Sequence, residues 1–289
     1  MKASAFEYRR ARSVAEACGW LSSNDGARLL AGGQSLLPAM NMRLATPSLL
    51  IDITAIDELR GIATAAGVLR IGALVRHVEL LRSAEVAKQA PLLAQAIAHV
   101  AHPAIRNRGT IGGNLAHADP ASELPACMLV LGATMIASGP KGERRIAAGE
   151  FFQGVFETAL AGDEMLIAVE VPVAKPAQRF SFLELARRSG DYAIAGLACS
   201  AMHRGGVLSD VKLGFFAVGD RPVLALGAAA ALAMSSDAAA VEAAKSALAQ
   251  DLDPQDDLQG SAALRLHLSR VLLERSVASL LTQETGGAP

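Results

Sequence analysis

Ala31-Gly32-Gly33-Gln34-Ser35-Leu36 is a glycine-bearing stretch, and Thr110-Ile111-Gly112-Gly113-Asn114-Leu115 is a second one later in the chain. In each, a glycine pair is followed by polar and then by apolar residues. Such a pair adopts backbone angles closed to other residues and has no Cβ to obstruct a ligand. Two such turns facing each other would direct backbone N–H groups into one cavity, which suits a diphosphate group. The alternative is that both pairs only make tight turns.

The size and charge of the chain narrow the classes of function. Its 289 residues exceed what one compact core usually organises, so we expect two or three domains. The formal net charge is −1, and aromatic residues make up 4% of the chain. This composition offers neither a basic surface nor many base-stacking rings, so we do not expect nucleic-acid binding.

The three cysteines, Cys18, Cys127 and Cys199, lie far apart in the sequence. Their spacing fits neither a disulfide framework nor an iron–sulfur or zinc site, so we expect buried, inert thiols. The N-terminus lacks the apolar run of a signal peptide, and the longest apolar run, near residues 126–137, is too short to cross a bilayer. These features predict a cytoplasmic protein without an integral membrane segment.

The first part of the chain reads as a small β-α-β unit. Residues 13–21 suit a helix with Ser13 as its N-cap, residues 27–31 a strand that feeds the first glycine turn, and residues 48–53 a second strand. Ser35 could cap the intervening helix or bind a phosphate, and Pro38 falls in the first turn of that helix. The unit lacks the G-x-G-x-x-G pattern, so a Rossmann motif is not predicted.

The middle of the chain shows short apolar runs separated by turn residues. This texture indicates a mixed sheet with helices on one side. We expect strands at residues 67–74, 133–137 and 164–171, and helices at 91–100 and 126–131.

A proline-containing linker, residues 172–176, precedes the last part of the chain. Beyond it we expect antiparallel strands at residues 180–188, 194–203 and 208–218, then helices at 225–247 and 261–281. The last of these has leucines and valines at near-helical spacing, which indicates an amphipathic helix facing a core.

Other candidate sites are weaker. His77, His99, His102 and His117 lack HxH or HExxH spacing, so the sequence does not predict a metal site. Arg106 and Arg108 flank the second glycine turn, where they could add positive potential, contact a partner, or simply lie exposed. No nucleophile elbow or paired-carboxylate arrangement is evident.

Taken in order along the chain, the motifs resemble those of the FAD-binding medium subunit of molybdenum hydroxylases, the carbon monoxide dehydrogenase, quinoline oxidoreductase and xanthine dehydrogenase family. The resemblance covers essentially the whole chain. The motifs that carry it are Ala31-Gly32-Gly33-Gln34-Ser35-Leu36-Leu37-Pro38, Met42-Arg43-Leu44, Thr110-Ile111-Gly112-Gly113-Asn114, Ala118-Asp119-Pro120-Ala121-Ser122-Glu123-Leu124-Pro125 and Ala186-Arg187-Arg188-Ser189-Gly190-Asp191-Tyr192-Ala193.

The resemblance implies an α+β protein with three domains. An N-terminal β-α-β subdomain, residues 1–55, and a mixed five-stranded middle subdomain, residues 56–175, would hold FAD between them in a PCMH-type FAD-binding fold. Residues 176–289 would form a C-terminal domain like that of the carbon monoxide dehydrogenase flavoprotein, an antiparallel three-stranded sheet with a helical bundle.

The resemblance also implies roles for individual residues. The two glycine motifs would hold the diphosphate and the ribityl chain, Glu123 would meet a ribose hydroxyl, and Tyr192 would shield one face of the flavin ring. His117 would neighbour the flavin, and Asn114 would contact the ligand or cap its turn. The implied cofactor-binding set is Leu29, Leu30, Ala31, Gly32, Gly33, Gln34, Ser35, Leu36, Val100, Thr110, Ile111, Gly112, Gly113, Asn114, His117, Glu123, Leu166, Glu184 and Tyr192.

Two positions depart from the family pattern. Glu123 stands where aspartate is commoner, and Glu184 stands where many relatives carry lysine. A negative charge in place of a positive one beside a flavin would disfavour its reduced, anionic form. The chain also has no cysteine-bearing insertion, so the iron–sulfur-containing variant of this subunit is not expected.

The function that the resemblance implies is electron transfer. The chain would carry FAD and pass electrons to an external acceptor. A small partner subunit would supply two [2Fe-2S] clusters and a large one the molybdopterin cofactor, in a dimer of heterotrimers. The substrate would be an N-heteroaromatic compound, an aldehyde or carbon monoxide, and no catalytic residue is assigned to this chain because the cofactors carry the redox chemistry. The alternatives are a stand-alone FAD-dependent oxidase or dehydrogenase and a flavin-free scaffold.

Overall fold

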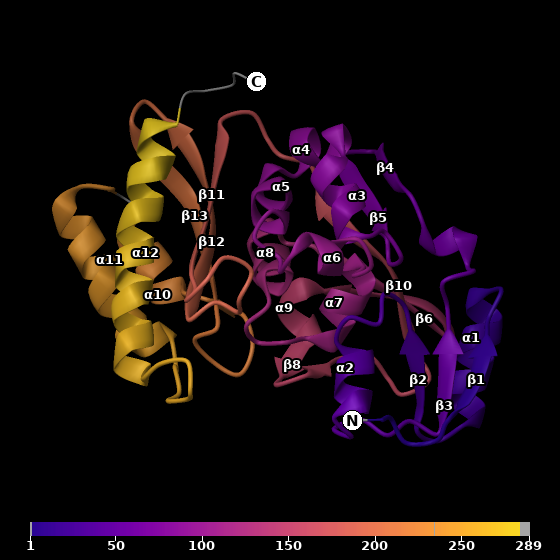
Figure 1. Ribbon diagram of the computed structural model, residues 1–289. Helices are drawn as coiled ribbons and strands as arrows, with labels where there is room; N and C mark the ends of the chain where they lie inside the picture. The colour runs from indigo at the N-terminus through magenta and orange to yellow at the C-terminus, as the bar shows by residue number, and fades with distance from the viewer. Residues whose placement is uncertain (1, 234, 284–289) are drawn as a thin grey trace.

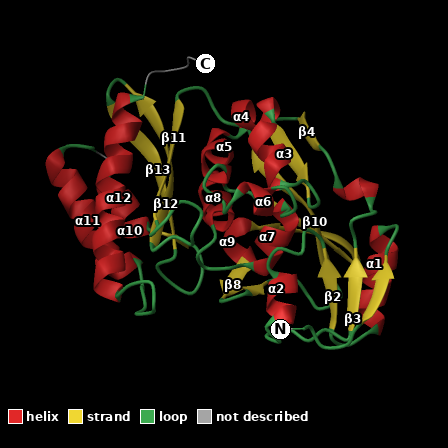
Figure 2. Ribbon diagram, in the orientation of Figure 1, coloured by secondary structure: helices red, strands yellow, loops and turns green. Residues whose placement is uncertain are grey.

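The computed structural model describes residues 2–233 and 235–283. Three sheets follow one another across the molecule, with a layer of helices between the second and the third (Figure 1, Figure 2). The N-terminal unit has a parallel sheet of order β1-β3-β2. Its elements are β1 (Glu7–Arg10), α1 (Val14–Ser23), β2 (Ala27–Leu30), α2 (Leu36–Asn41) and β3 (Leu49–Asp52).

The N-terminal unit folds as the sequence predicts, with one additional strand. Ser13 caps α1, where its side chain accepts a hydrogen bond from the Glu16 N–H. The central strand β3 is buried along its whole length. The hydrophobic core that contains it also includes Ile136 and Ile167 of the middle unit. The additional strand is β1, whose residues are mostly exposed because it forms one edge of the sheet. Its polar, exposed residues gave no hydrophobic pattern to detect.

The middle unit contains a five-stranded sheet of order β4-β5-β10-β6-β7. Every neighbouring pair in it is antiparallel, so the expected mixed pairing was wrong, while the number of strands is as expected. Hairpin connections at β4–β5 and β6–β7 force antiparallel pairing because their loops are too short for a crossover. The strands are β4 (Ile62–Ala65), β5 (Val68–Gly72), β6 (Thr134–Gly139), β7 (Gly142–Ala147) and β10 (Met165–Pro172).

Helices cover one face of this sheet. α8 is buried on nearly all sides because it lies between the middle unit and the C-terminal sheet, which it contacts at β12 and β13. The elements are η1 (Asp57–Leu59), α3 (His77–Arg82), α4 (Ala84–Gln89), α5 (Pro91–Ile97), α6 (Pro103–Arg106), α7 (Ile111–His117), α8 (Glu123–Leu131) and α9 (Ala148–Phe151), with the short hairpin β8 (Phe152–Gly154) and β9 (Glu157–Thr158).

The C-terminal sheet is antiparallel, in the order β11-β12-β13-β14. It has four strands rather than the expected three, because the two residues of β14 pair with β13 after a short loop. Successive side chains along β12 and β13 point to opposite faces of the sheet, so each face packs into a different hydrophobic core. Leu197 and Phe215 face the outer helices, and Ala198 and Phe216 face α8. The strands are β11 (Gln178–Leu185), β12 (Ala195–Arg204), β13 (Val207–Phe216) and β14 (Val223–Leu224).

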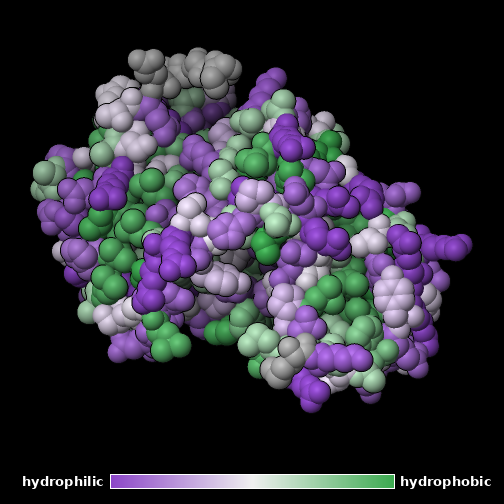
Figure 3. Space-filling view, viewed as in Figure 1, coloured by the Kyte–Doolittle hydropathy of each residue, from purple (hydrophilic) through white to green (hydrophobic). Residues whose placement is uncertain are grey.

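Three helices, α10 (Leu226–Ala231), α11 (Ala238–Asp251) and α12 (Ala262–Thr282), cover the outer face of this sheet (Figure 1). Apolar side chains are visible among polar ones over α11 and α12 (Figure 3). A single helix at residues 225–247 was expected, but two form there, because Asp237 caps the second by accepting from the Ala240 N–H. Ser261 caps α12 in the same way, at the residue where the expected helix begins.

The three cysteines are free and buried, as expected. Within residues 2–233 and 235–283, no helix combines the length and apolarity needed to cross a membrane.

Candidate functional site

The two glycine turns lie against each other. Gly32 follows β2, and a Cβ built on it would overlap the carbonyl oxygen of Arg108 and lie 2.9 Å from the Cα of Gly109. Gly33 has a φ of +70°, in the left-handed region that favours glycine. The facing arrangement predicted from the sequence is therefore present, and only glycine fits at position 32.

The second turn packs closely against the protein, and its N–H groups donate to acceptors within the chain rather than to a ligand. The Gly112 N–H donates to the Ala73 carbonyl at 2.9 Å, and a Cβ on Gly112 would overlap Ala73. The Ile111 N–H donates to Val75 at 3.0 Å, and the Gly113 N–H donates to the Thr110 hydroxyl at 3.2 Å. These N–H groups are already used, so the expectation that both turns direct free donors into the cavity was wrong for this one.

The first turn does supply free donors. The backbone N–H groups of Gly32, Gly33, Gln34 and Ser35 have no acceptor among the residues that the structure describes. The Gln34 side chain closes the turn by donating to the Gly32 carbonyl at 2.9 Å. Ser35 occupies the N-cap position of α2, but its side chain makes no capping hydrogen bond. Consecutive unpaired N–H groups in a turn form a concave binding surface for an anion.

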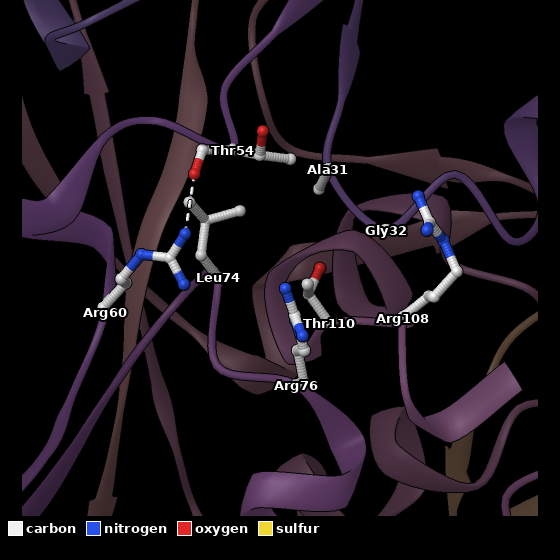
Figure 4. A pocket seen from close by; sticks show the side chains of 8 residues that line it. All are labelled: Ala31, Gly32, Thr54, Arg60, Leu74, Arg76, Arg108 and Thr110. Carbon is white, nitrogen blue, oxygen red and sulfur yellow. Dashed lines mark hydrogen bonds between the residues drawn. The ribbon is translucent and has the colours of Figure 1, made fainter. Parts of the chain in front are cut away.

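A cavity of about 180 Å³ opens where the turns meet. Figure 4 shows three guanidinium groups around it, from Arg60, Arg76 and Arg108. Arg60 also donates to the Thr54 carbonyl at 2.6 Å. Arg76 and Arg108 have no acidic partner within 4.0 Å in the described part of the chain, so their charges are available to a ligand. The lining residues are Ala31, Gly32, Thr54, Arg60, Leu74, Arg76, Arg108 and Thr110.

Sequence reasoning found only half of this cavity. Ala31, Gly32 and Thr110 belong to the glycine motifs and Arg108 flanks the second one. The other four lining residues, Thr54, Arg60, Leu74 and Arg76, were not predicted. The missed residues lie in connections around η1 and before α3, where a loop arginine carries no distinguishing pattern. Arg106 instead has a structural role, because its Nη1 donates to the carbonyls of Val100 and Ala101 at 2.8 and 2.7 Å.

A second group of polar residues extends from the second turn to α8. The Asn114 amide donates to the Ser122 hydroxyl at 2.8 Å and accepts from it at 3.1 Å, so this side chain joins the turn to the start of α8. The next residue, Glu123, is 9% exposed. Burial raises the pKa of its carboxyl to about 7, and the nearby negative charge of Glu184 adds to the effect.

Glu184, on β11, is held by His99. One carboxylate oxygen lies 3.4 Å from the His99 Nδ1, and the other is buried with no hydrogen-bond partner among the described residues. The hydrogen bond to Glu184 raises the pKa of His99. An unpartnered, buried carboxylate oxygen is a group that could accept a hydrogen bond from a ligand.

Two rings lie near this polar group. The His117 ring packs against Phe156, with centroids 4.8 Å apart. Tyr192 is 59% exposed, and its pKa is raised to about 12 by desolvation of its hydroxyl and by Asp119. The remaining expected residues flank the site: Leu29 and Leu30 end β2, Leu36 begins α2, Leu166 is buried in β10, and Val100 is buried after α5.

The structure therefore brings the predicted residues together in two places rather than one. The first is the arginine-lined cavity at the glycine turns. The second is the polar group around Glu123 and Glu184, between the middle and C-terminal units. The first of these places fits a diphosphate through its donors and its charge.

Comparison with known proteins agrees with this geometry. Residues 4–174 match the FAD binding domain in molybdopterin dehydrogenase, and residues 180–280 match the CO dehydrogenase flavoprotein C-terminal domain. The chain belongs to this family. It is an FAD-binding medium subunit of the molybdenum hydroxylases, and so an oxidoreductase component.

Relatives of this medium subunit match along nearly their whole lengths. It is 38% identical to the 6-hydroxypseudooxynicotine dehydrogenase complex subunit alpha of Paenarthrobacter nicotinovorans, covering 97% of this chain and 96% of the relative. It superposes on carbon monoxide dehydrogenase from Hydrogenophaga pseudoflava with a TM-score of 0.95 at 36% identity, covering 97% and 98% of the two chains. For quinoline 2-oxidoreductase from Pseudomonas putida 86 the TM-score is 0.92 at 38% identity, with 97% and 98% covered.

Proposed function

We propose that this medium subunit holds the FAD diphosphate in the arginine-lined cavity and passes electrons from iron–sulfur clusters to an external acceptor. The observation that carries the proposal is the convergence of Arg76 and Arg108 on a turn whose N–H groups have no acceptor in residues 2–233 and 235–283. A doubly charged diphosphate satisfies both kinds of donor at once. The flavin supplies the redox chemistry when bound, and the chain supplies binding, orientation and electrostatics.

In this proposal the remaining predicted residues border other parts of the cofactor. The stretches Leu29–Leu36 and Thr110–Asn114 run along the diphosphate and ribityl chain, and Glu123 meets a ribose hydroxyl. Val100, Leu166, Glu184 and His117 border the flavin or its adenine end, and Tyr192 covers one face of the ring. In this proposal the units are residues 1–55, 56–175 and 176–289, with FAD between the first two.

The same proposal gives the chain its partners. A large subunit holds the molybdopterin cofactor and the substrate, and a small subunit holds two [2Fe-2S] clusters, in a cytoplasmic dimer of heterotrimers. Among its relatives are a nicotine 6-hydroxylase medium subunit at 38% identity and quinoline 2-oxidoreductase, also at 38%. Both names point to nitrogen-containing aromatic rings, which supports an N-heteroaromatic substrate ahead of an aldehyde or carbon monoxide.

Purification of the complex from its natural host tests the proposal. The expected preparation contains two further subunits, molybdenum, iron and FAD, and FAD is released from this chain on denaturation. A colourless chain would favour the flavin-free scaffold. A yellow chain that purifies alone and oxidises an organic donor would favour the stand-alone oxidase.

A further inference from the structure

Arg265 is a buried cation far in sequence from any residue assigned to the flavin. It lies in the first turn of α12 and is 5% exposed. Its Nη1 donates to the carbonyls of Ile194 at 2.8 Å and Ala217 at 2.6 Å, and its Nη2 donates to the Asp257 carboxylate at 2.6 Å. One planar guanidinium therefore joins three separate segments in a fixed geometry.

One of the two carbonyls that Arg265 binds is near Tyr192 in sequence, and the other belongs to a segment that contacts Pro120. Ile194 is two residues beyond Tyr192 and begins the return into β12. Ala217 has a φ of +60°, and its N–H donates to the Pro120 carbonyl at 2.8 Å. Pro120 follows Asp119, the carboxylate that acts on the Tyr192 phenol. Arg265 thus holds the segment that carries the tyrosine and, through Ala217, the segment that carries its acidic neighbour.

Further contacts secure the same loop. The Asp257 carboxylate also accepts from the Gln259 and Gly260 N–H groups, which shapes the turn before α12. Arg187, at the start of the Tyr192 loop, donates to two carbonyls of that turn at 3.0 and 3.2 Å. On the other side Gly190, with a φ of +86°, packs against the His102 ring so closely that a Cβ would overlap it. The exposed tyrosine therefore stands on a loop fixed from both sides.

We propose that Arg265 is a positioning residue for electron transfer, which holds Tyr192 and Asp119 in the arrangement that covers the flavin. The inference rests on the proposed function, because that function places Tyr192 on the flavin ring. Arg265 donates its hydrogen bonds to the backbone at Ile194 and Ala217, so it acts on the tyrosine through the loop that carries it. Without the guanidinium these two carbonyls would lose their donors and rearrange to find new partners, and the loop that carries Tyr192 would move.

The chain offers a matched control for this arginine. Arg179 is 8% exposed and donates to the carbonyls of Leu280 and Leu281, at the opposite end of α12. Arg179→Met therefore removes a similar set of buried hydrogen bonds from the same unit without touching the Tyr192 loop. The test compares Arg265→Met, Arg265→Lys and Arg179→Met in the intact flavin-loaded complex. If Arg265→Met does not fold, Asp257→Asn replaces it, because it weakens the grip of the guanidinium while keeping an acceptor.

The first measurement is flavin fluorescence, which a stacked aromatic ring quenches. Arg265→Met should raise it to about the level of Tyr192→Ala, and the double variant should show no further rise because both changes act through one contact. Arg265→Lys should restore part of the quenching, and Arg179→Met should leave it unchanged. An equal rise in Arg179→Met and Arg265→Met would overturn the inference, because general loosening would then explain both.

A second measurement separates this inference from the proposed function. Tyr192→Trp in a Trp20→Phe background places the only tryptophan of this chain on the loop. Its nanosecond anisotropy should show a larger amplitude of motion with Arg265→Met than with Arg179→Met, whether or not flavin is present. Arg265→Met could loosen the loop while Tyr192→Ala leaves flavin fluorescence unchanged. That result would contradict the placement of Tyr192 on the flavin, but it would support the role of Arg265 in holding the loop. Unchanged anisotropy in Arg265→Met would show that Arg265 does not hold the loop.

Discussion

The carbonyl oxygen of Arg108 occupies the space in which a side chain on Gly32 would begin. The contact is between two backbones, one after β2 and the other just before the second glycine turn. It brings the free N–H groups of the first turn to the arginine-lined cavity. The glycine at position 32 is therefore required by the contact between the turns, independently of any ligand.

Gly32→Ala tests the importance of that contact. The added Cβ must push the two loops apart, so we expect FAD affinity to fall about 10- to 100-fold, equivalent to ~1.4–2.8 kcal/mol. The ratio of flavin to protein after gel filtration measures this. The control is Gly19→Ala in α1, where nothing lies within 4 Å of the new Cβ and the helix should gain about 0.5–1 kcal/mol. Full flavin content in Gly32→Ala would show that the turns need not touch to hold FAD.

The cavity arginines predict a charge-dependent affinity for FAD. Arg76→Ala should raise the dissociation constant of FAD about tenfold or more, because a hydrogen bond to a charged group contributes ~1.5–3 kcal/mol. Calorimetric titration of the apoprotein with FAD at two salt concentrations measures the change. Arg82→Ala, on the exposed side of α3, should have no effect. Equal affinity for FAD in wild type and Arg76→Ala would contradict the placement of the diphosphate in this cavity.

The buried carboxyl of Glu123 predicts a pH-dependent stability. Its folded pKa of about 7 is above the ordinary value of 4.5 for a glutamate, so between these values the folded state binds more protons than the unfolded state. Stability therefore decreases as pH rises from about 4.5 to 7, and the full loss is present above pH 7. Glu123→Gln removes the ionisation, so the variant should be more stable than wild type at pH 8, by up to ~3 kcal/mol in the free energy of unfolding. Its thermal midpoint should therefore be higher than that of wild type at pH 8 but not at pH 4.5.

The control for that measurement is Glu143→Gln on the exposed strand β7. It should shift the midpoint equally little at both pH values. A Glu123→Gln midpoint that differed from wild type by the same amount at pH 4.5 and pH 8 would mean that the carboxyl does not titrate in this range.

The Glu184 carboxylate predicts a lowered flavin potential. Glu184→Lys replaces a negative charge by a positive one, which favours the reduced flavin and should raise the two-electron midpoint potential by about 30 mV or more, equivalent to ~1.4 kcal/mol. Glu184→Gln should lie between the two. Spectroelectrochemical titration of the complex gives the potentials, and Glu143→Lys supplies a distant charge change as the reference. If Glu184→Lys shifted the midpoint potential no more than Glu143→Lys does, Glu184 would be too far from the flavin to act on it.

Local sequence determined much of this fold. Ser13 and Ser261 mark where α1 and α12 begin, because their side chains cap the first helical turn. The glycine pairs mark the two turns that meet, and alternating or continuous apolar runs mark most of the strands. These signals are short-range: a cap, a turn or a buried face needs only a few neighbouring residues to be recognised.

Tertiary structure decided what those signals leave open. The position of β10 between β5 and β6 and the pairing of the edge strand β1 with β3 depend on partners distant in the chain. Arg60 and Arg76 resemble any loop arginine until the fold brings them to the glycine turns, and Arg265 is an ordinary helix residue until α12 packs over Ile194 and Ala217. The second glycine pair has the same appearance in sequence as the first, yet its N–H groups donate to the Ala73 carbonyl and the Thr110 hydroxyl. Whether a donor or a charge is free for a ligand depends on which groups surround it, and only the folded chain fixes those groups.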